Sequence, residues 1–135
     1  MNLNRSIALL TIRLVLGFIF LMQGIGKVFI WGIERLYELS FESYEKYLPS
    51  GLLYIVTYYT SYIELIGGIF LLLGLWRDYT LYALASVLVI VSFGHGLATP
   101  IWNLDHVIFR LVLLVALLLL PKEWDTYRAD HFLKR

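Results

Sequence analysis

Four long apolar segments are the feature that most limits how this chain can fold. They lie at about 6–29, 52–75, 79–97 and 104–120. A hydrocarbon core about 30 Å thick is crossed by about 20 residues of α-helix, with a range of roughly 17–25 residues. Because lipid offers no hydrogen-bond partners to an exposed backbone, each segment is predicted to be a membrane-spanning helix.

The composition agrees with this prediction. Hydrophobic residues make up 60% of the 135-residue chain and its mean hydropathy is +0.76, whereas a soluble domain is roughly 45–50% apolar. A net charge of +1 indicates no nucleic-acid surface, and the lack of cysteine excludes disulfides, thiol catalysis and Cys-ligated metals. We therefore expect an all-α membrane protein, a single four-transmembrane-helix bundle over residues 1–135 with an interfacial first loop. Any redox chemistry needs a bound cofactor or a partner.

Turn-forming residues and basic residues predict the topology. Pro49, Gly74, Pro100 and Pro121 lie at the breaks between the apolar segments. Lys and Arg are more numerous on the side that holds the N-terminus, the second turn and the tail. The positive-inside rule then places both termini in the cytoplasm; in a bacterial inner membrane the first and third loops would face the periplasm. The tail at 122–135 is expected to be an interfacial anchor.

The first loop, at about 30–48, mixes aromatic with acidic residues. Phe41, Tyr44 and Leu48 repeat at helical spacing, which predicts a short amphipathic helix in the membrane interface. This segment is either a lid over the mouth of the bundle or a packed surface loop. We expect the packed surface loop.

Seven ionisable residues lie within the apolar segments. They are Arg13, Lys27, Glu64, His95, Asp105, His106 and Arg110. A charge at membrane depth costs at least about 2.5–3.5 kcal/mol, so such side chains usually face the bundle interior and pair or bind something. Arg13 and Lys27 share one helical stripe with Gly17 and Gly24, whose small size permits close helix packing.

Depth along the helices indicates which of these groups can meet. At about 1.5 Å per residue, Arg110 lies near the level of Glu64, so a Glu64–Arg110 ion pair is predicted. Lys27, His95, Asp105 and His106 all fall near the opposite side of the membrane from the termini. The expected picture is a polar cavity open to the periplasm with Glu64 at its floor and Arg13 apart from it.

Each candidate also has a structural interpretation. Arg13 either pairs with an anionic lipid or extends to the interface, or has a functional role. Lys27 lies close enough to the outer interface to extend to it, but its place on the glycine stripe argues for a position inside the bundle. Glu64 is either part of a buried pair that locks two helices together or a ligand or proton site. His95 and His106 raise the question of haem, which needs opposed imidazoles across an open slot. Two histidines in a tight hairpin rarely provide that, so neither haem nor a metal site is expected.

The spaced charges and glycines resemble a known family. The pattern Arg13-x3-Gly17-x2-Phe20-x3-Gly24-x2-Lys27, followed by Glu64-x2-Gly67-Gly68-x5-Gly74 and Arg77, is similar to that of the DoxX family of small bacterial membrane proteins. The resemblance covers nearly the whole chain and implies a four-helix bundle associated with redox membranes. A related branch, the DoxD-like proteins, provides a subunit of thiosulfate:quinone oxidoreductase. Other relatives are linked to redox-stress complexes or thiol metabolism.

Three functions follow as hypotheses. The favoured one is a redox-associated accessory subunit that binds a quinone or similar small molecule, with candidate binding residues Glu64, Arg110, His95, His106, Lys27 and Arg13. Glu64 is the best catalytic candidate if the chain is itself part of a quinone-linked oxidoreductase. The first alternative is a non-enzymatic anchor or assembly module of a larger complex, and the second is a pathway for small solutes or protons. The partners are either the proteins of a redox complex or further copies of this chain.

Overall fold

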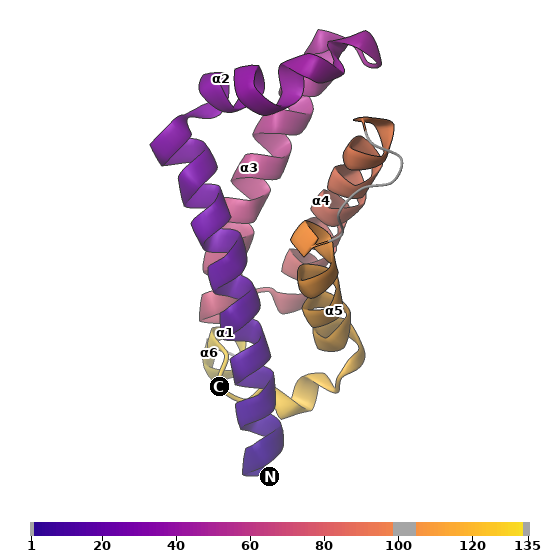
Figure 1. Cartoon of the computed structure of the whole chain (residues 1–135). Coiled ribbons are helices and arrows are strands. Elements are labelled where there is room, and N and C mark those ends of the chain that lie inside the picture. The colour runs from indigo at the N-terminus through magenta and orange to yellow at the C-terminus, as the bar shows by residue number, and fades with distance from the viewer. Residues whose placement is uncertain (1, 99–104, 134–135) are drawn as a thin grey trace.

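The computed structural model describes residues 2–98 and 105–133, apart from the side chains of Ala98, Asp105 and His106. Its long helices are α1 (Leu3–Ile25), α3 (Ser50–Leu73), α4 (Arg77–Ala98) and α5 (Asp105–Leu119). They run alongside one another as a bundle (Figure 1). We call the end that holds the N-terminus and the tail the terminal end, and the end at residues 26–49 the loop end.

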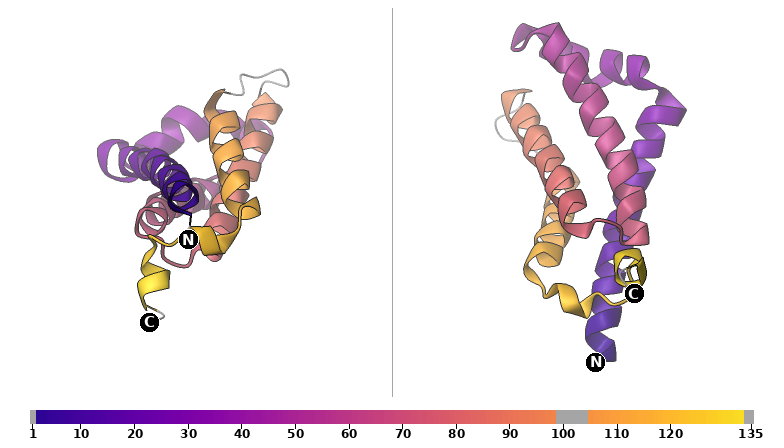
Figure 2. Two further views of the ribbon diagram at one scale, coloured as in Figure 1. Left: turned by 90° about the horizontal axis from the view of Figure 1, so that it is seen from below. Right: turned by 180° about the vertical axis from the view of Figure 1, so that it is seen from behind.

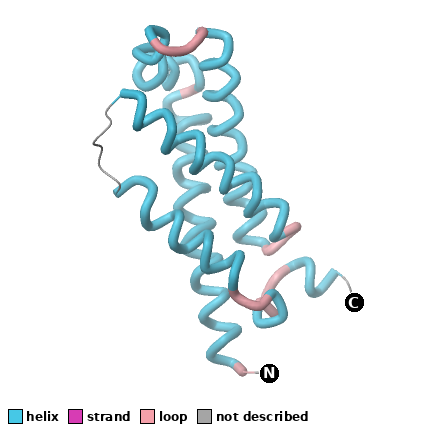
Figure 3. The backbone as a smooth tube through the Cα atoms, turned by 90° about the vertical axis from the view of Figure 1, so that its right-hand side faces the viewer, coloured by secondary structure: helices cyan, strands magenta, loops and turns pink. Residues whose placement is uncertain are grey.

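The membrane character of the helices confirms the predicted fold class. Among the described residues, α1 with its extension to Trp31, α3 and α4 are each long and apolar enough to cross a membrane, and a shorter apolar helix covers Val107–Leu119. Helix ends differ from the predicted spans by a few residues, as expected where helices fray. Figure 3 shows how much of the described backbone is helical.

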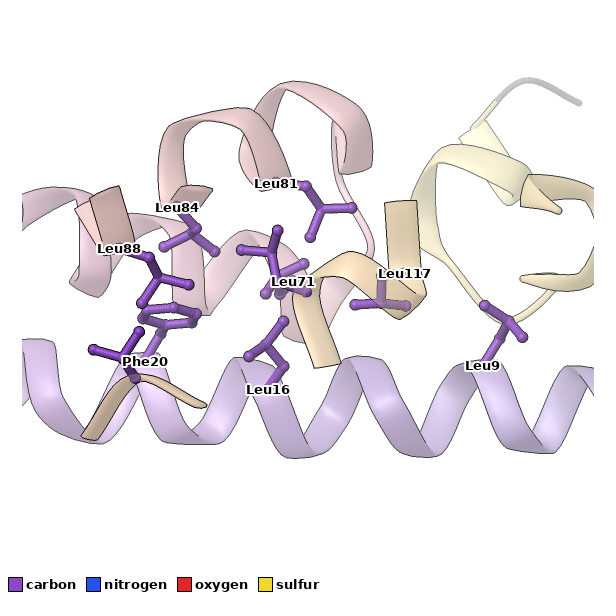
Figure 4. Packing of buried hydrophobic residues seen from close by; sticks show 10 residues of the cluster. Leu9, Leu16, Phe20, Leu71, Leu81, Leu84, Leu88 and Leu117 are labelled. Carbon is purple, nitrogen blue, oxygen red and sulfur yellow. The ribbon is translucent and has the colours of Figure 1, made fainter. Parts of the chain in front are cut away.

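The interior of the bundle is packed mainly with leucine. Leu16, Leu71, Leu84 and Leu117 are at most 1% exposed and belong to one cluster with Phe20 (Figure 4). Large apolar side chains also cover the outside, where Val89 and Phe109 are 69% and 67% exposed. Since lipid chains are as apolar as leucine, close packing and buried polar contacts hold such helices together more than hydrophobicity does.

Glycines bring α1 and α3 into backbone contact. A Cβ atom added at Gly24 would lie 2.5 Å from the backbone N and Cα of Leu65, and one added at Gly68 would lie 2.5 Å from the backbone N of Leu21. Each glycine therefore fits against the opposite helix at a point where no larger residue can. This contact fixes the height of Lys27, which follows Gly24 on the same stripe, relative to α3.

We expect Gly24→Ala to destabilise the protein by about 1–3 kcal/mol, since the new methyl group must push one backbone away from another. Gly26→Ala is the matched control, because a Cβ at Gly26 meets nothing within 4 Å. Denaturation in mixed detergent micelles measures both variants. Equal stabilities for the two would show that α1 and α3 do not approach this closely.

The turn between α3 and α4 is a tight cap. Gly74 has φ +73°, and the amides of Gly74 and Leu75 both donate to the Phe70 carbonyl, at 2.8 and 2.9 Å. The additional Gly74 bond to Leu71 completes a Schellman motif, which favours glycine at this position. The Gly74 carbonyl accepts from the amide of Asp130, so the turn also holds the tail. In Figure 2 the tail passes across the terminal end of the bundle.

The first loop is helical, but it is a series of short pieces and not one amphipathic helix. They are the π-helical turns Gly26–Trp31 and Tyr37–Phe41, α2 (Ile33–Leu36) and the 3-10 turn Glu42–Lys46. The loop crosses from the end of α1 to the start of α3 (Figure 1).

A buried tyrosine holds this loop to α3. The ring of Tyr37 stacks on that of Tyr54, with centroids 3.7 Å apart and planes 8° from parallel. The Tyr37 hydroxyl donates to Glu45 at 2.6 Å. Burial, assisted by the bond to Glu45, raises the pKa of Tyr37 to about 12, so the hydroxyl remains a donor at every physiological pH.

Candidate functional site at the loop end

Glu64 is the centre of a polar cluster between α1, α3 and α5. The Lys27 Nζ atom lies 2.8 Å from Glu64 Oε2, and Arg110 Nη1 lies 3.6 Å from Glu64 Oε1. Arg110 Nη1 also donates to Gln23 Oε1 at 2.8 Å. We call Gln23, Lys27, Glu64 and Arg110 the Glu64 cluster. It contains the predicted Glu64–Arg110 pair and adds Lys27 as a closer partner.

The members of the Glu64 cluster differ in burial. The Glu64 side chain is 0% exposed and that of Arg110 is 6% exposed, whereas the Lys27 side chain is 27% exposed. The guanidinium of Arg110 also lies 5.4 Å from the centroid of the Phe20 ring, which suits a cation at the negative face of an aromatic ring. Arg110 is therefore enclosed within the bundle, and Lys27 is the member that reaches outward.

One face of α3 is built for this cluster. Its buried residues are mostly small or hydroxylic: Thr57, Thr60, Ser61, Glu64, Gly67 and Gly68. The hydroxyls of Thr57 and Thr60 donate to carbonyls one turn earlier, at 2.7 and 2.8 Å, which satisfies them within the helix. The Ser61 hydroxyl and Glu64 Oε1 are buried without a hydrogen-bond partner among the described residues. Polar capacity therefore remains beside the carboxylate.

A cavity of about 560 Å³ adjoins the cluster. Its walls come from α3 and α4, its roof comes from the first loop, and Lys27 lies at one side. The polar residues in its lining are Lys27, Ser40, Tyr44, Thr60 and His95, and the others are apolar or glycine. Volumes of about 300–1,000 Å³, mostly apolar with a few polar groups, are typical of small-molecule sites.

The predicted candidates thus fall into three groups. Lys27, Glu64 and Arg110 are brought together, and His95 lines the adjoining cavity. The side chains of Asp105 and His106 lie outside the part of the chain that the structure describes. The predicted nearness of His95 and His106 therefore stays a prediction.

The position of Glu64 differs from the expectation in one respect. It does not form the floor of the cavity, because it is fully buried and the lining contains Lys27 instead. Lys27 therefore lies between the carboxylate and the open space. Phe41, Tyr44 and Leu48 also line the cavity, so the first loop covers it as a lid does.

Arg13 belongs to a second cluster at the terminal end. Its Nε atom lies 3.4 Å from Asp125 Oδ2, and Arg77 Nη1 lies 3.5 Å from the same oxygen. Arg128 Nε donates to the Asp125 carbonyl at 2.9 Å. We call Arg13, Arg77, Asp125 and Arg128 the Asp125 cluster. Arg13 is 0% exposed, so the interpretation that it pairs with lipid or extends to the interface is wrong.

Helix ends supply much of the negative charge in this cluster. Arg13 donates to the carbonyls of Leu71 and Leu72, at 2.6 and 3.0 Å, and Arg77 donates to that of Leu117. These carbonyls lie in the last turns of α3 and α5, where a helix carries roughly −0.5 of an elementary charge. Arginines that cap two helix ends and share one carboxylate hold the helices together, and neither Arg13 nor Asp125 lines the cavity beside Lys27.

The predicted role of the tail is therefore wrong in part. Asp125 is 1% exposed and Arg128 is 8% exposed, so this stretch is part of the bundle and not only an anchor in the interface. Sequence reasoning missed Asp125 because it is one acid in a polar tail. The available signal was Arg13, which has no acidic residue at its depth within the apolar segments.

Comparison with known proteins identifies one family. The family model described as DoxX matches residues 8–119. The match includes every residue of the Glu64 cluster and the walls and roof of the cavity, and it ends before Asp125. Neither curated proteins nor solved structures give a match. Within the described residues, no group of three or more His, Cys, Asp or Glu side chains could hold a metal ion.

Proposed function

Because the chain belongs to the DoxX family of membrane proteins, we propose that it is a redox-associated accessory subunit that binds the ring of a quinone, or a similar small molecule, in the cavity beside Lys27. The observation that carries this proposal is the position of Lys27, which pairs with Glu64 at 2.8 Å and also lines the cavity. We place the protein in a bacterial inner membrane with both termini in the cytoplasm, which puts the cavity near the periplasmic face.

The chemistry of the cavity fits a neutral ring with carbonyl oxygens. An ammonium group has three N–H donors, and one of those on Lys27 is directed to Glu64, which leaves donors for a ligand carbonyl. Phe41, Tyr44 and Phe93 offer aromatic surface to the ring, and His95 offers a second polar contact. A small number of polar groups in an apolar pocket orients such a ligand.

Glu64 and Arg110 act on the ligand through Lys27. The carboxylate holds the ammonium group at the edge of the cavity through Oε2, while its Oε1 atom faces Arg110, which in turn donates to Gln23. If a partner protein supplies electrons that reduce the ring here, the Glu64 cluster would transfer the accompanying proton.

Lys27→Met tests the proposal, since methionine keeps most of the side-chain volume and removes the donors. We expect binding of a quinone in lipid nanodiscs to weaken by roughly 10–100-fold, the equivalent of the 1.5–3 kcal/mol typical of a hydrogen bond from a charged group. Lys46→Met is the matched control, because Lys46 is an exposed loop lysine that lies over the ring of Tyr47 and does not line the cavity.

Two outcomes would contradict the proposal. One is that wild-type protein binds no quinone, and the other is that both lysine variants bind it equally well. Wild-type protein that binds no quinone but still joins a redox complex would favour the assembly role instead. Mass spectrometry of the molecules that co-purify in mild detergent gives an independent measurement.

A further inference from the structure

The side of the cavity between α3 and α4 is formed by residues that also face outward. Leu52 is 45% exposed, Phe93 is 61% exposed and Val89 is 69% exposed, and all three line the cavity. Val89 lies nine residues before the end of α4 at Ala98, about 14 Å along the helix. Val89 is therefore expected at membrane depth, where an exposed apolar surface faces lipid.

The water-facing side of the cavity has a different lining. The roof is formed by Phe41, Tyr44 and Leu48 of the first loop. The loop that carries them is fastened by the Tyr37–Tyr54 stack and the Tyr37–Glu45 hydrogen bond. The cavity is thus covered toward water by a tethered apolar lid and bordered toward lipid by exposed apolar side chains.

From this contrast we infer that the ligand reaches the cavity sideways from the bilayer, between α3 and α4, and is an amphiphile: an acceptor head at Lys27 joined to a long apolar chain that leaves through the opening at Val89. This inference rests on the proposed function and narrows its ligand class to quinones that carry a prenyl or alkyl chain. A water-soluble quinone without a chain is excluded as the natural ligand.

The apolar chain of the ligand determines the route by which it enters, and it adds little to the binding affinity within the membrane. Lipid chains are as apolar as the lining, so moving the chain from the bilayer into the opening gains little hydrophobic free energy. It does keep the ligand concentrated at the depth of the opening. The head then supplies the specific contact, and the opening only has to admit the chain without a clash.

Photolabelling in lipid nanodiscs tests this inference with two probes, an azido-benzoquinone without a chain and the same ring with a decyl chain. We expect Val89→Trp to reduce labelling by the decyl probe by at least about tenfold, because the indole fills the space that the chain needs, and to reduce labelling by the smaller short probe much less. Val112→Trp is the matched control, because Val112 on α5 is 60% exposed and does not line the cavity.

The outcomes separate this inference from the proposed function. If Val89→Trp affects neither probe, the sideways route is wrong while quinone binding stands. If it affects both probes equally, the chain does not leave through the opening at Val89, and the inference about the ligand class is wrong. If neither probe labels wild-type protein above the Lys27→Met background, both proposals fail. Should Val89→Trp not fold, wild-type protein still decides: competition in favour of the short probe at equal membrane concentration would overturn the inference, and competition in favour of the decyl probe would support it.

Discussion

Replacing Asp125 by asparagine is expected to lower the free energy of unfolding by about 3–5 kcal/mol, one of the two largest effects of a single substitution that the structure predicts. The change keeps the size of the side chain and removes the charge that Arg13 and Arg77 share, at 3.4 and 3.5 Å. Both arginines are at least 98% buried. Removing one partner of a buried ion pair costs this much because it leaves the other charge uncompensated.

Asp78→Asn is the control for that substitution. Asp78 pairs with Lys122 at 2.9 Å, but both side chains are about two-fifths exposed. Exposed pairs contribute about 0–1 kcal/mol, so this variant is expected to unfold close to the wild type. Denaturation in mixed detergent micelles measures both. Similar losses for Asp78→Asn and Asp125→Asn would show that the Asp125 cluster is hydrated and not enclosed.

Glu64→Gln is expected to have an effect of the same order, about 3–5 kcal/mol, since it leaves Arg110 enclosed without a carboxylate. Lys27→Met should cost less, about 1–2 kcal/mol, because Glu64 keeps Arg110 and because part of the Lys27 side chain is already exposed. The two variants therefore separate stability from binding. Lys27→Met affects mainly the ligand, and Glu64→Gln affects the fold first.

The order of these two effects is the measurement that matters. Unfolding of each variant in the same detergent gives the order directly, and Gln23→Leu is a suitable third variant, since it removes only the amide that accepts from Arg110 at 2.8 Å. If Lys27→Met proves more destabilising than Glu64→Gln, Lys27 is a structural partner of the carboxylate, and its role toward a ligand loses its basis.

The sequence was sufficient to predict whatever depends on periodicity and length. The spans followed from the width of a bilayer, and the stripe that carries Gly24 and Lys27 followed from the helical repeat. The Glu64–Arg110 pair followed from depth alone, because two charges at the same level of a small bundle have few other partners. These are local or one-dimensional properties, and the structure agrees with them.

Contacts between residues far apart in the sequence could not be predicted from periodicity and length. The partner of Arg13 lies 112 positions later, at Asp125, in a tail with no hydrophobic pattern to fix its place. Lys27 was equally suited to the interface, and its pairing with Glu64 depends on how closely α1 and α3 approach. The first loop has the composition of a surface helix, yet it consists of short helical pieces, one of which begins at Tyr37, whose ring stacks on that of Tyr54.

The Asp125 cluster also imposes an order on biosynthesis. Its charged members come from the first helix, the middle of the chain and the tail, so Arg13 and Arg77 enter the membrane before Asp125 has been translated. Until the last residues leave the ribosome, those two arginines must be kept hydrated at the interface or shielded by the insertion machinery. A chain interrupted after α5 would have its long helices but not Asp125. Quality-control proteases could then recognise it as unfinished, because Arg13 and Arg77 would have no carboxylate partner.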